Sequence, residues 1–211
     1  MITHNDYSKK TSQLFEKLDS NNMLIPFNDD PKFDKIFERN NSTMHISEMK
    51  YMIFTDVEFF KKYKKFWLPF DVNEFDLYND FIQQGASYVL WLFELLKRFL
   101  LMILDVKKLQ INEKSTLGNI IFKISKETNL NKNELEDLLM LKIRNIIAHD
   151  SWYFEEKNFC YEEDGITKKL TLEDFVQLIV NVTDMTNSIA IHWGKYIPKL
   201  EFERMRKKMS S

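Results

Sequence analysis

Cysteine, glycine and proline are all scarce in this chain of 211 residues, which has one Cys, four Gly and four Pro. The lone Cys160 excludes a disulfide within the chain and a cysteine-rich metal site. Few glycines and prolines disfavour a turn-rich β fold. The sequence also lacks a Gly-rich phosphate-binding loop and any His/Glu cluster with zinc or di-iron spacing. It therefore predicts neither a cofactor nor a catalytic metal.

The chain also lacks a strong net charge and a long uninterrupted apolar run. Its formal net charge is −2, so any contact with RNA has to come from a local basic patch. The apolar stretch 88–104 is interrupted by Glu94, Lys97 and Arg98 before it reaches the roughly 20 residues that a bilayer requires. The N-terminus has no apolar core of a signal peptide. These features predict a cytoplasmic protein with no membrane association.

Leu, Ile, Phe, Lys and Glu are plentiful, which favours long helices and an all-α fold. We predict three regions: an N-terminal helical extension over 1–70, a helical bundle over 71–197 and a basic tail over 198–211. Within the extension, Leu14, Phe15 and Leu18 form the apolar stripe of a short helix. A second amphipathic helix is expected over 44–67, and Pro69 ends it.

The bundle is expected to begin with a long helix over about 73–110 that could bend near Gly85. Ser115 or Thr116 can start the next helix, and Asn131 resembles the cap of the one after it. A short β-hairpin over 158–170, turning at Asp164-Gly165, separates the last two core helices. The final helix opens at Thr171 and is expected to end near residue 196, leaving the tail as a frayed, solvated end.

The segment 135–153 carries the most informative pattern. Placed on one helix, its residues form a broad apolar side made of Leu135, Leu139, Met140, Ile143, Ile146 and Ile147. Arg144, Asn145 and His149 lie opposite, and Asn145 and His149 are neighbours because they are four residues apart. Leu138, Leu141 and Ala148 fall among these polar groups on the same helical projection. A surface of that mixed kind predicts a cleft or a subunit interface.

Arg144-Asn145-Ile-Ile-Ala-His149 resembles the motif of HEPN domains, in which an arginine precedes a histidine by four to six residues. The resemblance implies a small antiparallel helical bundle that is commonly dimeric. Many members of that family are metal-independent ribonucleases of toxin–antitoxin or antiviral systems, and others have lost catalysis and serve as binding modules. A tyrosine often follows the histidine by two residues in members that pair with a nucleotidyltransferase antitoxin. Here that position is Ser151, so the sequence departs from the pattern of that subgroup.

Two other stretches invite a nucleic-acid interpretation. Arg39 and His45 repeat the motif's spacing, but the intervening Asn-Asn-Ser-Thr is typical of a helix break. The basic and aromatic stretch 61–67 is a weak candidate for RNA binding through its lysines, Lys61, Lys62, Lys64 and Lys65. The aromatic residues between them recur at helical spacing, which favours a core face with solvated lysines.

Metal-independent RNA cleavage needs proton transfer at the 2′-hydroxyl and at the leaving oxygen, and positive charge beside the phosphorane. Histidine suits proton transfer, and the planar arginine fork suits phosphate. By this resemblance Arg144 and His149 are the catalytic residues, with Asn145 in support, in a composite site at a homodimer interface. His149 lies at the C-terminal end of its helix, which suits a proton donor or phosphate ligand better than a base.

The predicted function is therefore an endoribonuclease that acts on RNA and leaves 2′,3′-cyclic phosphate ends, with an antitoxin or other regulatory protein as a partner. Two alternatives stay open. A non-catalytic module of the same fold could bind a nucleotide or a protein partner. In an unrelated helical interaction protein, Arg144 and His149 would only close the helix by capping carbonyls or pairing with Asp150.

Overall fold

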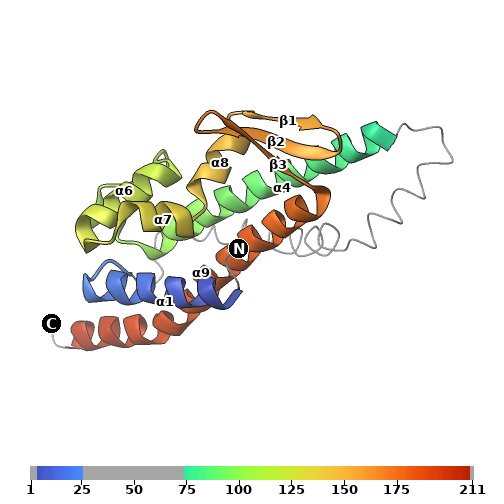
Figure 1. The fold of residues 1–211 in the computed structure, drawn as a ribbon. Coiled ribbons are helices and arrows are strands. Elements are labelled where there is room, and N and C mark those ends of the chain that lie inside the picture. The colour runs from blue at the N-terminus through green and yellow to red at the C-terminus, as the bar shows by residue number, and fades with distance from the viewer. Residues whose placement is uncertain (1–3, 26–73, 210–211) are drawn as a thin grey trace. The chain divides into compact units, whose positions relative to one another are not determined.

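The structure is a computed structural model that describes residues 4–25 and 74–209. Helices make up most of this part of the chain, together with one small antiparallel sheet (Figure 1). In the labels of Figure 1 the elements are α1 (His4–Ser20), α4 (Glu74–Ile103), α5 (Val106–Leu109), α6 (Leu117–Thr128), α7 (Lys132–Leu138), α8 (Leu141–Ala148), β1 (Trp152–Glu155), β2 (Asn158–Glu163), β3 (Ile166–Leu170) and α9 (Leu172–Met209).

The described chain divides into two compact units, and each is built from separate segments. The first unit comprises 4–25, 94–141 and 184–209, and the second comprises 74–93 and 142–183. The long helices α4 and α9 contribute residues to both units. The consecutive regions expected from the sequence, 1–70, 71–197 and 198–211, stay a prediction.

In the first unit, α6 forms as the sequence predicts. The Thr116 hydroxyl accepts a hydrogen bond from the backbone N–H of Asn119 at 3.2 Å, which caps the first turn. The predicted apolar stripe of α6 is buried, and it consists of Leu117, Ile120, Ile121 and Ile124. The next helix, α7, begins at the predicted cap, where Asn131 Oδ1 accepts from the N–H of Asn133 at 2.9 Å.

Helix α1 lies alongside the C-terminal half of α9 within the same unit (Figure 1). The predicted apolar stripe of α1 is buried, and its Phe15 ring stacks on Tyr196 at 5.7 Å and on His192 at 6.2 Å between ring centroids. The expectation that the last helix ends near residue 196 was wrong, since α9 continues through Pro198 to Met209. Lys199 pairs with Asp19 of α1 just beyond the proline.

The first helix of the bundle is shorter than expected. It ends at Ile103 instead of continuing to about residue 110. The chain then pairs with the segment after α1, where the N–H of Ile25 donates to the carbonyl of Ile103 at 3.0 Å. Asp105 caps the separate short helix α5, since its side-chain oxygen accepts hydrogen bonds from the backbone N–H groups of Lys107 and Lys108. No helix in the described ranges is both long and apolar enough to cross a membrane.

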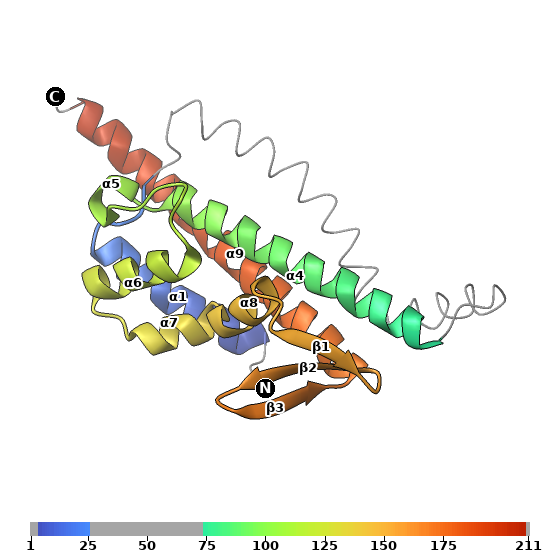
Figure 2. The ribbon, with the colours of Figure 1, turned by 90° about the horizontal axis from the view of Figure 1, so that it is seen from above.

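In the second unit the predicted hairpin is present as β2 and β3. Asp164 and Gly165 turn the chain with φ of 53° and 75°, which suits a two-residue type I′ turn. The sequence analysis missed a third strand, because β1 pairs antiparallel with β2 and gives the order β1-β2-β3 (Figure 2). The turn between β1 and β2 also has positive φ, at Glu156 and Lys157, although neither residue is a usual turn former.

Aromatic stacking joins this sheet to α9. Phe159 is fully buried between the rings of Trp152 and Phe175, each at 5.0 Å between centroids. Gly85 of α4 approaches the same place, because a Cβ at this position would lie 2.6 Å from Cε1 of Phe175. This close packing is a physical reason for a glycine in the middle of a long helix.

Candidate active site on helix α8

The segment that carries the Arg/His motif is divided into two helices, where we expected one. Helix α7 ends at Leu138 and α8 begins at Leu141. Between them Met140 has a φ of 49°, in the left-handed region, so the backbone changes direction. A single helical projection of residues 135–149 is therefore not valid, because it assumes one unbroken helix.

The predicted mixed surface is therefore wrong in part. Leu138 and Leu141 are only 3% and 9% exposed, so the chain itself already covers them. Leu141 lies against Gly118 of α6, where an added Cβ would be 3.5 Å from Leu141 Cδ2. These two leucines do not contribute to an exposed interface beside the polar residues. Within α8 the expected apolar side holds, since Ile146 and Ile147 are buried.

The end of α8 is closed by the backbone. The N–H of Ser151 donates to the carbonyl of Ile146 at 3.0 Å, and the N–H of Asp150 donates to the carbonyl of Ile147 at 3.3 Å. With Asp150 at a φ of 50°, these bonds form a Schellman motif in which His149 is the last residue of the turn. The His149 ring makes no hydrogen bond or ion pair within the part of the chain that the structure describes. Within these residues the His149 ring therefore neither caps a carbonyl of α8 nor pairs with Asp150.

Arg144 and Asn145 are joined by their side chains. The guanidinium of Arg144 donates from Nη1 to Asn145 Oδ1 at 3.2 Å. Arg144 is half-buried, whereas Asn145 and His149 are exposed. One helical turn separates Asn145 from His149, and the N–H of His149 donates to the carbonyl of Asn145 at 3.0 Å. The structure thus brings a cation and an amide together beside an exposed imidazole.

One polar residue of α8 was not among the predicted site residues. Lys142 precedes Asn145 by three residues and His149 by seven, a spacing that places all three on one helical face. Its Nζ lies 2.6 Å from Glu163 and 3.3 Å from Asp164 at the turn after β2. Hydrogen bonds to Glu163 and then to Asp164 raise the pKa of Lys142. Two carboxylates compensate its charge, which makes Lys142 a poor candidate for binding an anion.

This arrangement has the parts for metal-independent phosphoryl chemistry. A half-buried guanidinium can hold an anionic oxygen, and an exposed imidazole can transfer a proton. No three His, Cys, Asp or Glu side chains in residues 4–25 and 74–209 are grouped so that they could hold a metal ion.

Some of the predicted features lie outside the residues that the structure describes. They are the RNA-binding lysines Lys61, Lys62, Lys64 and Lys65, the helix over 44–67 and the second Arg/His spacing at Arg39 and His45.

Comparison of the chain with protein-family models, with curated proteins and with solved structures found no match.

Proposed function

We propose that this protein is a metal-independent endoribonuclease whose site includes Arg144, Asn145 and His149. The observation that carries the proposal is the 3.2 Å hydrogen bond from Arg144 to Asn145, one turn before an exposed imidazole that makes no hydrogen bond or ion pair with the residues that the structure describes. A histidine that served only to close the helix would be engaged with a carbonyl or a carboxylate. At the end of α8, backbone N–H groups of Asp150 and Ser151 already bind the last carbonyls and close the helix.

Each residue has a distinct role in the proposed reaction. The 2′-hydroxyl attacks the adjacent phosphorus, the bond to the 5′-oxygen breaks, and a 2′,3′-cyclic phosphate forms. Arg144 stabilises the additional negative charge on the phosphorane. His149 donates a proton to the departing 5′-oxygen. Asn145 orients the guanidinium through Oδ1, which leaves its amide nitrogen as a donor for a phosphate oxygen.

The reaction also needs a group that accepts the 2′-hydroxyl proton. One chain offers a single Arg144 and a single His149, so a second copy that brings its own pair would complete the site. This is the reason to propose a homodimer, and it rests on the chemistry and the family resemblance. The buried Leu138 and Leu141 give it no support. A role in a toxin–antitoxin or antiviral system rests on the resemblance alone.

The test compares wild-type protein with His149→Ala on a mixed RNA substrate in EDTA. We expect the variant to lose about 10²- to 10⁴-fold in cleavage rate, the range that general acid–base catalysis contributes. His45→Ala is the matched control, since Arg39 and His45 have an allowed motif spacing, and it should cleave at the wild-type rate. Thermal melting checks that all three proteins are folded.

Two outcomes would contradict the proposal. Cleavage that persists in His149→Ala would assign the activity to another site or to a contaminating nuclease. Absence of cleavage by the wild-type protein, with retained binding of RNA, would favour the non-catalytic binding module.

A further inference from the structure

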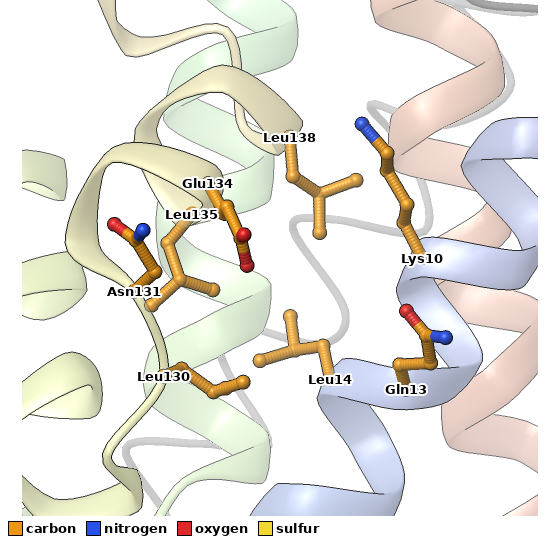
Figure 3. A pocket seen from close by; sticks show the side chains of 8 residues that line it. All are labelled: Lys10, Gln13, Leu14, Leu130, Asn131, Glu134, Leu135 and Leu138. Carbon is orange, nitrogen blue, oxygen red and sulfur yellow. The ribbon is translucent and has the colours of Figure 1, made fainter.

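A second candidate site lies in the first unit, and none of the residues proposed for catalysis lines it. A cavity of about 260 Å³ opens between α1 and α7 (Figure 3). Its apolar part includes Leu14, Leu135 and Leu138, which are 2%, 3% and 3% exposed and therefore form a fixed floor. The volume falls just below the roughly 300–1,000 Å³ of pockets that hold drug-sized ligands. A ligand of amino-acid size would fill it.

Three polar side chains stand around this floor. Lys10 and Gln13 come from α1 and Glu134 comes from the first turn of α7. Figure 3 shows the Glu134 carboxylate directed into the space between the two helices. None of the three side chains makes a hydrogen bond or an ion pair with any residue that the structure describes. All three are exposed, so water solvates them when the cavity is empty.

The charges restrict the chemistry of a ligand. A phosphate or a dicarboxylate would be attracted by Lys10 but repelled by Glu134. A divalent cation would be attracted by Glu134 but repelled by Lys10. A purely apolar ligand would fill the floor and displace water from both charges without replacing its hydrogen bonds. A ligand with one ammonium and one carboxylate satisfies both groups. An ion pair between exposed side chains contributes little to the free energy of unfolding, so the protein is hardly destabilised when Lys10 and Glu134 do not pair with each other.

We infer that this cavity binds a small zwitterion with an apolar body, of the chemical class of a free amino acid with an aliphatic or aromatic side chain. The Lys10 ammonium binds the ligand's carboxylate, and the Glu134 carboxylate binds its ammonium. The leucine floor takes the side chain. The Gln13 amide can donate to the ligand or accept from it. Asn131 also lines the cavity, but its Oδ1 is already engaged in capping α7.

The test is calorimetric titration of the full chain with L-leucine and L-phenylalanine. Two further probes lack one charge each: 4-methylpentanoic acid has no amine, and isopentylamine has no carboxylate. The lining variants are Lys10→Gln and Glu134→Gln. Matched controls are Lys9→Gln on α1 and Asp137→Asn on α7, because both residues are exposed and neither lines the cavity.

At least one of the two amino acids should bind saturably, and each lining variant should weaken that binding about three- to fivefold, as expected for loss of an ion pair to an exposed side chain. The control variants should stay within about twofold of wild type. The one-charge probes should bind more weakly, with the acid sensitive only to Lys10→Gln and the amine only to Glu134→Gln. Thermal melting should show equal stability, since every substituted side chain is exposed.

Three results would overturn the inference. One is the absence of saturable binding of both amino acids by the wild-type protein at millimolar concentration. Another is equal weakening by lining and control variants. The third is binding of the acid or the amine as tightly as the amino acid, which would leave one of the two charges without a role. None of these outcomes depends on ribonuclease activity.

Discussion

The backbone of α4 at Gly85 lies so close to Phe175 of α9 that an added Cβ would stand 2.6 Å from the ring atom Cε1. Phe175 is fully buried and stacks on Phe159, so its ring has no room to move away. We predict that Gly85→Ala destabilises the protein. Overpacking costs about 1–3 kcal/mol, and the better helix propensity of alanine returns only about 0.5–1 kcal/mol. Urea unfolding should show a net loss.

Gly194 of α9 provides the matched control for this prediction. It is exposed, and nothing lies within 4 Å of a Cβ added there. Gly194→Ala should therefore raise the free energy of unfolding by about 0.5–1 kcal/mol, because only the helix propensity changes. If both variants shift stability in the same direction, the close approach at Gly85 is not what requires a glycine.

Asp150 occupies a left-handed position that glycine adopts at lower cost. Its φ is 50°, and its N–H forms one of the two hydrogen bonds that close α8. Asp150→Gly should stabilise the protein by up to about 1 kcal/mol, whereas Asp150→Val should destabilise it by more than about 1 kcal/mol. Chemical denaturation of the two variants measures both effects. Equal stability of the two variants would contradict the helix ending described for His149.

Burial gives Tyr7 a pH-dependent effect on stability. Desolvation, and then the nearby charge of Asp184, raise the pKa of its phenol above the ordinary value of 10.0. Tyr7 therefore contributes stability that is fully present below about pH 10 and is lost as the pH rises through the folded-state value. We predict that Tyr7→Phe loses less stability than wild type between about pH 9 and pH 11.

At neutral pH the same substitution should cost only about 0.5–1 kcal/mol, since the Tyr7 hydroxyl donates to a weak acceptor, the Met140 sulfur, at 3.9 Å. Urea unfolding across this pH range gives both quantities. Tyr153→Phe, at a residue that is 43% exposed, should retain the wild-type profile and serves as the control. A Tyr7→Phe profile that parallels wild type would contradict the assignment.

Cys160 should be chemically inert in the folded protein. It is fully buried in β2, and burial raises the pKa of its thiol, which lowers the fraction of reactive thiolate. We predict that a thiol reagent modifies Cys160 on the order of 100-fold more slowly in native protein than in urea. A stoichiometric reaction of comparable speed in both conditions would mean that β2 opens readily in the native state.

Local signals explain which elements could be predicted from the sequence. Thr116 as a cap, Asp164-Gly165 as a turn and the apolar spacing of α6 each act within a few residues, and the structure has all three. The features that were missed lack such signals. Nothing at Met140 marks a helix break, and neither Glu156 nor Lys157 marks the turn that makes β1 a strand.

The continuation of α9 beyond Pro198 was missed for a different reason. Proline inside a helix removes a backbone hydrogen bond, and sequence rules end the helix there. In the structure Leu200 is buried and Lys199 pairs with Asp19, so contacts with residues far away in the sequence support the next turn. The spacing of Arg144, Asn145 and His149 was predictable, but the bond between the first two and the intrachain burial of Leu141 were not.

The arginine in the proposed site should not be replaceable by another cation. Arg144 donates to Asn145 from Nη1, and a planar guanidinium presents its donors in a fork that matches the geometry of a phosphate. Lysine keeps the charge but lacks the fork. We expect Arg144→Lys to reduce RNA cleavage by on the order of 10-fold or more, with Asn145→Ala falling between this variant and wild type. Cleavage rates under single-turnover conditions measure both effects, and an Arg144→Lys rate equal to wild type would contradict a specific role for the planar guanidinium.

Analysis of the ends of the RNA fragments in EDTA tests the ribonuclease proposal most directly. We predict 2′,3′-cyclic phosphates on the upstream fragments, loss of cutting where a single 2′-deoxy nucleotide precedes the cleaved bond, and loss of all fragments with His149→Ala. Fragments that end in a 3′-hydroxyl, or cutting that continues beside the 2′-deoxy nucleotide, would contradict attack by the 2′-oxygen and with it the role proposed for Arg144 and His149.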